Sequence, residues 1–292
     1  MTLKTTTLLS LHNLISDALR KDAGPIGDVT TKALIQTNRY VRAKCFAKES
    51  GVISGINLIQ LVCKIAYPKI IVTVYVKNGD WVKKGGFIAE LQGSARAILM
   101  SERVTLEFLR RMSGIATKTH EFVEAVAGTG VTILDTRKTF PGYGELDKQA
   151  VRDGGGTNHR ANLSEMGLIK NNHIDLMGGD ITKAIRLFRK AYPKVFLEVE
   201  VRNMKELTEA LSQNPDRILL DNMTNVQLRS CVETRNEYTV KTNKKIPLEA
   251  SGNITLARVR EVARTGVEYI SIGALTHTVK PLDLSLHIES SK

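Results

Sequence analysis

Alternation of strand and helix patterns after Gly114 is the feature that most limits what this chain can fold into. The strand candidates are VTILDTR, MGLIKNN, FLEVEV, RILLD, IPLEASG and YISIGAL. Helical patterns at Ile181–Ala191, Met204–Ser212, Asn225–Glu233 and Leu256–Thr265 separate the later strands, at a spacing of roughly 20 to 30 residues. Such alternation is typical of parallel βα units, so this part of the chain is expected to be an α/β domain.

Polar side chains at the carboxyl end of nearly every strand candidate distinguish between the two α/β architectures. They are Asp135, Arg137 and Lys138; Lys170 and Asn171; Glu198 and Glu200; Asp221 and Asn222; Glu249, Ser251, Gly252 and Asn253; and Ser271 and Gly273. A closed barrel brings all its strand ends to one central site, whereas an open sheet does not. We therefore predict a C-terminal α/β barrel.

The chain before Gly114 has a different pattern. An amphipathic first helix is followed, between about residues 25 and 95, by β-rich runs separated by turn residues such as Asn78-Gly79-Asp80 and Gly85-Gly86. Apolar residues then recur at helical spacing from Ser101 to Met112, with Ser101 as the expected N-cap. These patterns predict an N-terminal α+β domain built on an antiparallel sheet.

Cationic side chains are concentrated in one stretch of the predicted barrel. They are Arg137, Lys138, Arg152, His159, Arg160, Lys170 and His173. Such a group would repel itself without anions, and its mixture of planar Arg and compact Lys suits a ligand with several carboxylates or phosphates. His159 is expected to donate a hydrogen bond as well, whereas His173 is expected to fill the core or cap a helix.

Two further groups complete the candidate site. Glu200 and Asp221 place carboxylates among the cations, where they can hold ribose hydroxyls, bind Mg²⁺, stabilise a positively charged sugar carbon, or simply pair with lysines. The segments EASGNITLARV and SIGALTH put small residues after the last two strands, where barrels commonly bind phosphate. No HxH or HExxH spacing is present, so a protein-only zinc site is not expected.

Composition excludes several classes. The 42 Lys+Arg residues exceed the 30 Asp+Glu by 12, which favours anionic ligands, but the longest basic runs are pairs, unlike those of most nucleic-acid binders. No apolar run reaches the roughly 20 residues of a membrane span, so we expect a soluble protein. Three cysteines without a CxxC pair suit a reducing cytoplasm, and the N-terminus reads as a helix rather than a signal peptide.

Long motifs spread over nearly the whole chain closely resemble the quinolinate phosphoribosyltransferase family. In order they are GDVTT, SERVTLEFLRRMSGIAT, LDTRKTFPG, AVRDGGGTNHR, LIKNNHI, EVEV, LLDN, EASGNIT and SIGALTH. The resemblance implies an N-terminal open α+β sandwich at 1–114, an incomplete TIM-like barrel at 115–275, and a tail at 276–292 that returns to the first domain. It also implies a homodimer, or a higher assembly of dimers, in which Arg103 serves the neighbouring active site.

The resemblance also implies roles for individual residues. Quinolinate and pyrophosphate groups would be bound by Arg137, Lys138, His159, Arg160 and Lys170 together with Arg103 of the neighbour. Glu200 and Asp221 would lie near the ribose and Mg²⁺, and with Lys138 and Lys170 they form the expected catalytic set. Phosphate would be bound by Ser251, Gly252, Asn253, Gly273 and Ala274.

The implied reaction transfers phosphoribose from phosphoribosyl pyrophosphate to quinolinate and releases pyrophosphate and CO₂. One alternative is a ModD-like sister transferase with another acceptor; the other is a nonenzymatic anion or nucleic-acid binder. Three residues depart from the family pattern: Glu107, Arg202 and Asn253. Because Asn tolerates positive φ, the Asn253 loop is expected to keep its shape, with its phosphate affinity left open.

Overall fold

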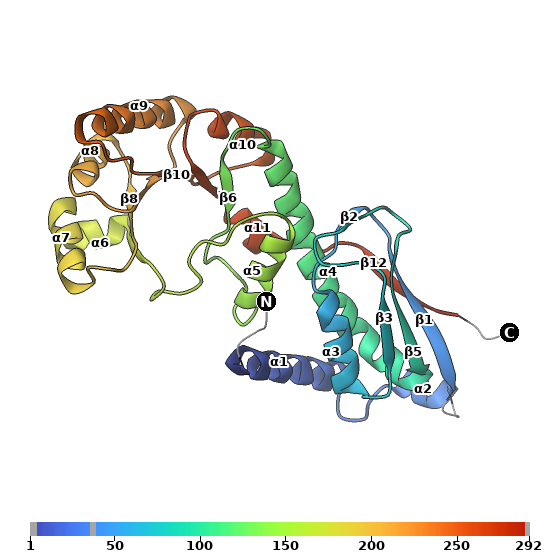
Figure 1. Cartoon of the computed structure of the whole chain (residues 1–292). Helices are drawn as coiled ribbons and strands as arrows, with labels where there is room; N and C mark the ends of the chain where they lie inside the picture. The colour runs from blue at the N-terminus through green and yellow to red at the C-terminus, as the bar shows by residue number, and fades with distance from the viewer. Residues whose placement is uncertain (1–4, 36–38, 290–292) are drawn as a thin grey trace. The chain divides into compact units, whose positions relative to one another are not determined.

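The computed structural model describes residues 5–35 and 39–289, and the chain divides into two compact units (Figure 1). We call them the sandwich unit, comprising Met1–Lys118, Pro141–Gly155 and Val279–Lys292, and the barrel unit, comprising Thr119–Phe140 and Gly156–Thr278. None of the helices in the described ranges is long and apolar enough to cross a membrane.

An antiparallel sheet forms the centre of the sandwich unit. Its strand order is β12-β1-β5-β3, with β1 at Tyr40–Ala47, β3 at Ile71–Val74, β5 at Phe87–Ser94 and β12 at Leu284–Glu289. Strands β2 (Gly51–Val52) and β4 (Trp81–Val82) pair with each other in a separate two-stranded antiparallel sheet. The tail of the chain is therefore an edge strand of the sheet built by the N-terminal part.

Helices complete the sandwich unit. They are α1 (Thr5–Ala23), α2 (Val29–Leu34), α3 (Ile56–Ala66), α5 (Gly144–Asp153) and the first part of α4 (Ala95–Ala125). One hydrophobic cluster joins α3, α4 and the sheet, with Ile59, Leu91 and Leu109 at 1% exposure each. The prediction of an N-cap at Ser101 is wrong: α4 starts at Ala95, and the Ser101 hydroxyl donates to the Ile98 carbonyl inside the helix.

Six parallel strands form the sheet of the barrel unit, in the order β6-β11-β10-β9-β8-β7. Their bounds are β6 Thr132–Leu134, β7 Gly167–Ile169, β8 Leu197–Val201, β9 Arg217–Asp221, β10 Leu248–Ser251 and β11 Tyr269–Ser271. Within the described ranges no ladder joins β6 to β7, so the barrel is incomplete. The predicted fold class is confirmed.

Helices connect these strands, and Figure 1 shows α7, α8, α9 and α10 along the outside of the sheet. Their bounds are α6 Asn171–Leu176, α7 Ile181–Ala191, α8 Met204–Ser212, α9 Asn225–Thr242, α10 Leu256–Ala263 and α11 Ala274–His277. On α7 the buried residues Ile181, Ala184 and Ile185 recur at helical spacing, as an amphipathic helix covering a sheet requires. The helices thus cover the outside of the sheet, and the strand ends remain available for polar groups.

Helix α5 groups with the sandwich unit although its sequence lies inside the segment 115–275 that we assigned to the barrel. Two carboxylates of α5 are bonded to residues of the sandwich unit. Asp147 is fully buried, and the Arg111 guanidinium donates to both of its oxygens at 3.0 and 2.8 Å. Asp153 in turn accepts from the Ser54 hydroxyl at 2.6 Å. These bonds satisfy carboxylates that would otherwise be costly to bury.

Candidate active site

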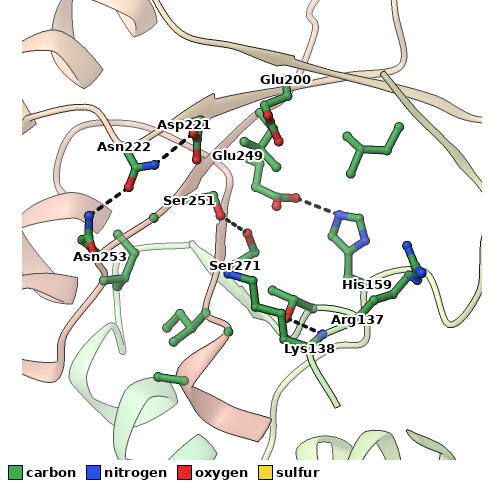
Figure 2. Close-up of a pocket in the computed structure, with 18 of the residues that line it drawn as sticks. Arg137, Lys138, His159, Glu200, Asp221, Asn222, Glu249, Ser251, Asn253 and Ser271 are labelled. Atoms are coloured by element: carbon green, nitrogen blue, oxygen red, sulfur yellow. Dashed lines mark hydrogen bonds and ion pairs between the residues drawn. The ribbon is translucent and has the colours of Figure 1, made fainter. Parts of the chain in front are cut away.

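A cavity of about 760 Å³ opens at the carboxyl ends of the barrel strands (Figure 2). Twelve residues proposed from the sequence line it: Arg137, Lys138, His159, Arg160, Lys170, Glu200, Asp221, Ser251, Gly252, Asn253, Gly273 and Ala274. They come from strands that lie far apart in the sequence, and parallel pairing brings their ends to one edge. The structure therefore places these side chains around a single space.

The loop that carries His159 and Arg160 is held by the strand before it. Asp135 follows β6 directly and is fully buried. Its two oxygens accept hydrogen bonds from the His159 backbone N–H at 2.7 Å and from the Asn158 side-chain amide at 2.8 Å. This arrangement fixes the backbone immediately before Arg160.

The cations of the cavity are close enough to affect one another. Burial, followed by the positive charge of Arg137, lowers the pKa of the Arg160 guanidinium, whereas the Glu198 carboxylate opposes this effect. Lys170 lies 3.6 Å from Glu200. An anionic ligand between these groups would relieve the repulsion between the two arginines, which makes the cavity suited to negatively charged molecules.

His173 has the capping role expected for it. Its Nδ1 atom accepts the Lys170 backbone N–H at 2.9 Å at the start of α6. The bond satisfies a backbone donor that the first turn of a helix leaves unpaired. It also fixes the backbone of Lys170, whose side chain lines the cavity.

The carboxylates of Glu200 and Asp221 line the same cavity from β8 and β9. Glu200 is 6% exposed and accepts the Asn171 backbone N–H at 3.4 Å, while Asp221 accepts from the Asn222 amide at 3.0 Å. Carboxylate oxygens are the ligands that Mg²⁺ prefers, usually together with phosphate oxygens and water. The two side chains therefore fit a magnesium ion shared with a phosphorylated ligand.

Small residues after β10 and β11 form the remaining wall of the cavity. Gly252 has φ +90°, and a Cβ atom there would lie 2.1 Å from Asn222 Oδ1. Asn253 has φ 53°, which confirms that Asn can take the left-handed conformation expected for this loop. Its amide donates to Asn222 Oδ1 at 3.0 Å, so the chain's unusual Asn is part of a bonded pair.

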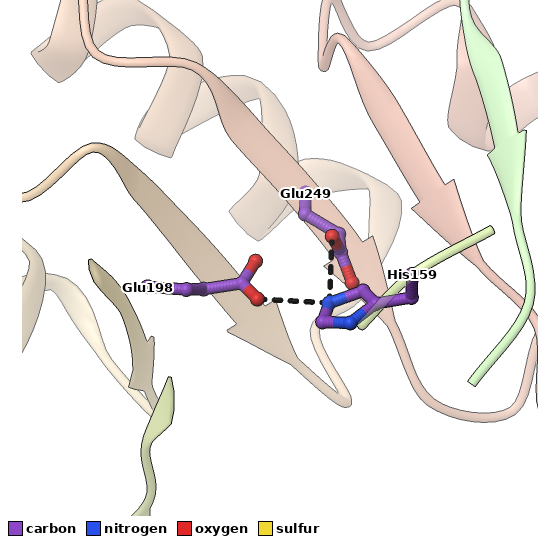
Figure 3. A group of neighbouring side chains, drawn as sticks. All are labelled: His159, Glu198 and Glu249. Carbon is purple, nitrogen blue, oxygen red and sulfur yellow. Dashed lines mark hydrogen bonds and ion pairs between the residues drawn. The ribbon is translucent and has the colours of Figure 1, made fainter. Parts of the chain in front are cut away.

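A buried charged cluster lies beside the cavity (Figure 3). His159 Nε2 is 2.9 Å from Glu198 and 3.6 Å from Glu249, and ligand atoms of these three residues lie within 4.8 Å of one another. Such a group can in principle hold a metal ion. Here Arg217 supplies the positive charge instead, since its Nε atom lies 2.7 Å from Glu198 and 3.3 Å from Glu249.

Sequence reasoning missed Arg217, as well as the cavity-lining Thr136 and His277. The available signal for Arg217 was a charge directly before the apolar run Ile218-Leu219-Leu220. In register, Arg217 lies opposite Glu198 on the neighbouring strand. A charge in a buried strand implies a partner, but only the register identifies it.

Glu249 is the member of the cluster with unsatisfied oxygens: it is fully buried, and neither carboxyl oxygen has a hydrogen-bond partner in the described chain. Burial, and then the negative charge of Glu198, raises the pKa of Glu249 well above its ordinary value of 4.5. For Glu198, burial acts in the same sense, but His159 and Arg217 outweigh it and lower its pKa. Two carboxyls this close do not both ionise easily.

Replacing Glu249 by glutamine should therefore stabilise the protein progressively as the pH rises. The folded chain keeps a proton on Glu249 that the unfolded chain loses above about pH 4.5, so this residue's stabilising contribution is lost as the pH rises towards its folded-state pKa. Glutamine carries no such proton. We expect the Tm of Glu249→Gln, relative to wild type, to increase as the pH rises above about 4.5 in thermal melts.

The matched control for this measurement is Glu237→Gln, which changes an exposed carboxyl on α9. Its Tm difference from wild type should stay nearly constant over the same range. A Glu249→Gln protein that loses stability relative to wild type as the pH rises would show that Glu249 is ionised and paired with Arg217.

Arg103 lies on α4 in the sandwich unit and is not among the residues that line the cavity. Its guanidinium is 3.3 Å from Glu107, one of the residues that depart from the family pattern. Arg202, another departure, pairs on the surface with Glu206 at 2.7 Å and Asp175 at 3.1 Å. Neither departure alters the cavity wall.

Comparisons with known proteins identify the family. The family models described as quinolinate phosphoribosyl transferase, N-terminal domain and C-terminal domain, match residues 28–113 and 115–287. A relative named quinolinate phosphoribosyltransferase (decarboxylating) 2b, mitochondrial, from Nicotiana tabacum is 43% identical, covering 96% of this chain and 82% of its own.

Two bacterial proteins are similar over nearly the whole length of both chains. The nicotinate-nucleotide pyrophosphorylase (carboxylating) of Mycobacterium leprae is 38% identical, with 95% of this chain and 96% of its own covered. The solved structure of the nicotinate-nucleotide pyrophosphorylase from Ehrlichia chaffeensis has a TM-score of 0.89 at 36% identity, covering 99% and 100% of the two chains. The chain belongs to the quinolinate phosphoribosyltransferase family.

Proposed function

We propose that this protein transfers the phosphoribosyl group of phosphoribosyl pyrophosphate to quinolinate and decarboxylates the product, giving nicotinate mononucleotide, pyrophosphate and CO₂ for NAD biosynthesis. The observation that carries the proposal is one cavity in which Arg137, Arg160 and Lys170 face the carboxylates Glu200 and Asp221. Cations suit a dicarboxylate and a pyrophosphate, while carboxylates suit a sugar that becomes positively charged.

In the first step the ring nitrogen of quinolinate attacks C1 of the pentose, and the bond from C1 to pyrophosphate breaks. Arg137, Arg160 and Lys170 hold the two ring carboxylates in line with C1, and Lys138 neutralises the leaving pyrophosphate together with Lys170. Glu200 and Asp221 stabilise the oxocarbenium-like carbon. Positioning of two bound reactants accounts for much of the rate gain in such a displacement.

In the second step the bond between the ring and the carboxylate next to the nitrogen breaks, and a proton takes the place of CO₂. The quaternised ring nitrogen accepts the electron pair, so the reaction needs no nucleophile from the protein. The residues around the ring therefore bind and orient rather than form a covalent intermediate.

Mg²⁺ is part of the proposal. Glu200 and Asp221 would hold the ion, which would supply positive charge that stabilises the departing pyrophosphate. The loops at Ser251, Gly252 and Asn253 and at Gly273 and Ala274 would bind the 5′-phosphate through backbone N–H groups. Small residues at these positions support close approach of a phosphate.

A cytoplasmic homodimer completes the proposal. Arg103 would reach the active site of a second copy, where it adds a further partner for the ring carboxylates. The exposure of its side chain, 59%, supports a role outside its own unit. The three cysteines are buried and free, which suits a reducing compartment.

Product analysis with two acceptors tests the function directly. The purified chain is supplied with phosphoribosyl pyrophosphate, Mg²⁺ and either quinolinate or nicotinate, and CO₂ and nicotinate mononucleotide are measured. We expect both products from quinolinate, since only the dicarboxylate has a carboxylate to lose. Turnover of another acceptor with no CO₂ from quinolinate would favour the ModD-like alternative, and salt-dependent DNA binding without turnover would favour the nonenzymatic one.

A further inference from the structure

Arg217 is a buried arginine for which the proposed reaction has no direct use. It begins β9, at the opposite end of the strand from the cavity-lining Asp221, and is 8% exposed. The rings of Phe196 and Tyr269 lie 5.6 and 5.0 Å from its guanidinium carbon. Removing this charge from water is costly unless the surrounding groups satisfy it, so its contacts indicate what it does.

The first contact is a two-point pair with Glu198. Arg217 Nε donates to Oε1 at 2.7 Å, and Nη2 donates to Oε2 at 3.3 Å. Parallel pairing of β8 with β9 places the two residues opposite each other. The planar fork of the guanidinium is thereby fixed in direction, which a lysine ammonium could not achieve.

The same Nη2 atom connects to the two residues that hold Arg160. It lies 3.8 Å from Met166 Sδ, and Glu198 Oε2, which accepts from it, also accepts from His159 Nε2 at 2.9 Å. His159 Nδ1 accepts the Arg160 backbone N–H at 2.9 Å, and the Met166 carbonyl accepts Arg160 Nη1 at 2.9 Å. Among the described residues these are the hydrogen bonds of Arg160, one at its backbone and one at its guanidinium.

The bonding of His159 supports the same relationship. Since Nδ1 accepts a backbone N–H, the ring proton belongs on Nε2, which donates to Glu198 Oε2 at 2.9 Å. Both ring nitrogens are then used by protein partners. These bonds give His159 a role in fixing the residue that follows it, and its expected hydrogen bond to the ligand stays a prediction.

We propose that Arg217 is a positioning residue for quinolinate: through Glu198 and His159, and through Met166, it holds the backbone and the guanidinium of Arg160 in the direction that binds a ring carboxylate. The inference rests on the proposed function, because it needs Arg160 to contact quinolinate. Arg217 itself touches neither substrate.

Substitution of Arg217 by lysine tests this role while keeping the positive charge next to Glu198 and Glu249. Quinolinate is varied at saturating phosphoribosyl pyrophosphate, and then the reverse. We expect KM for quinolinate to rise about fivefold to tenfold, with kcat and KM for phosphoribosyl pyrophosphate nearly unchanged. The control is Arg235→Lys, since Arg235 is 2% exposed and paired with Glu268 at 3.0 Å but does not line the cavity.

A double-mutant cycle separates positioning from general loss of structure. In an Arg160→Ala background, Arg217→Lys should cause no further rise in KM for quinolinate. An equal rise in both backgrounds, equal effects on both substrates, or an unchanged KM for quinolinate would each overturn the proposal. If Arg217→Lys does not fold in a thermal melt, Met166→Leu decides: it removes only the sulfur contact and should raise KM for quinolinate alone, and no rise overturns the proposal.

The outcome for the wild-type protein keeps the two proposals apart. If the wild-type chain releases no CO₂ from quinolinate, the proposed function itself is wrong. If the wild-type chain is active and Arg217→Lys leaves the quinolinate kinetics unchanged, only the role of Arg217 is wrong.

Discussion

Replacing Lys170 by alanine should lower kcat/KM for quinolinate by about tenfold to a hundredfold, since losing a charge-assisted partner costs about 1.5 to 3 kcal/mol. Lys170 lies in the cavity, 3.6 Å from Glu200. Its removal takes away a positive charge that binds the anionic substrate, and it also leaves the Glu200 carboxylate, which is 6% exposed, without this cation beside it. Arg137→Ala should act in the same direction. Steady-state assays of CO₂ release, with thermal melts of each variant, measure both effects.

Lys205→Ala is the matched control for Lys170→Ala. Lys205 is also a lysine of the barrel unit, but its side chain is 86% exposed and it does not line the cavity. Its removal should leave the kinetics unchanged. Near-normal activity in both Lys170→Ala and Arg137→Ala, with folded proteins, would mean that the cations of the cavity do not bind quinolinate.

The site could be anticipated from the sequence because of one property of parallel sheets. Strands that run in the same direction end at the same edge, so polar residues after Leu134, Ile169 and Leu220 had to meet once the six strands were recognised. Long motifs then gave the family. Neither step needed any distance between side chains.

What the sequence could not provide depends on register and on contacts between distant segments. Arg217 and Glu198 are 19 positions apart, and only the alignment of β8 with β9 places them opposite each other. The bond from Arg111 to the buried Asp147 likewise joins residues that are distant in the sequence. A charged residue inside an apolar sequence pattern indicates that it has a partner, but only the fold shows which residue that partner is.

The Asn253 departure shows how the structure compensates for a changed residue. A second glycine after Ser251 would supply positive φ without a side chain, and Asn253 reaches φ 53° instead. Its amide bonds Asn222, whose own amide bonds Asp221 at 3.0 Å. The phosphate loop and a carboxylate of the proposed catalytic set are thus joined by two asparagine side chains.

That linkage makes Gly252→Ala the substitution with the largest expected effect on phosphoribosyl pyrophosphate. The new Cβ would lie 2.1 Å from Asn222 Oδ1, at a φ of +90° that alanine rarely adopts. Relief of the clash moves Asn222 away from both Asp221 and Asn253. Strain of about 1 to 3 kcal/mol, together with a displaced loop, should lower kcat/KM for this substrate by about tenfold to a hundredfold or more.

Gly179→Ala separates the clash from backbone strain. Gly179 has φ +82°, close to that of Gly252, but a Cβ atom there meets nothing within 4 Å. It should lower the Tm through the same unfavourable φ and leave KM for phosphoribosyl pyrophosphate unchanged. Two results would contradict this prediction: unchanged kinetics in Gly252→Ala, or an equal rise in KM for phosphoribosyl pyrophosphate in Gly179→Ala. Either would mean that close packing of Gly252 on Asn222 does not shape the phosphate site and that the loop binds by side-chain charge alone.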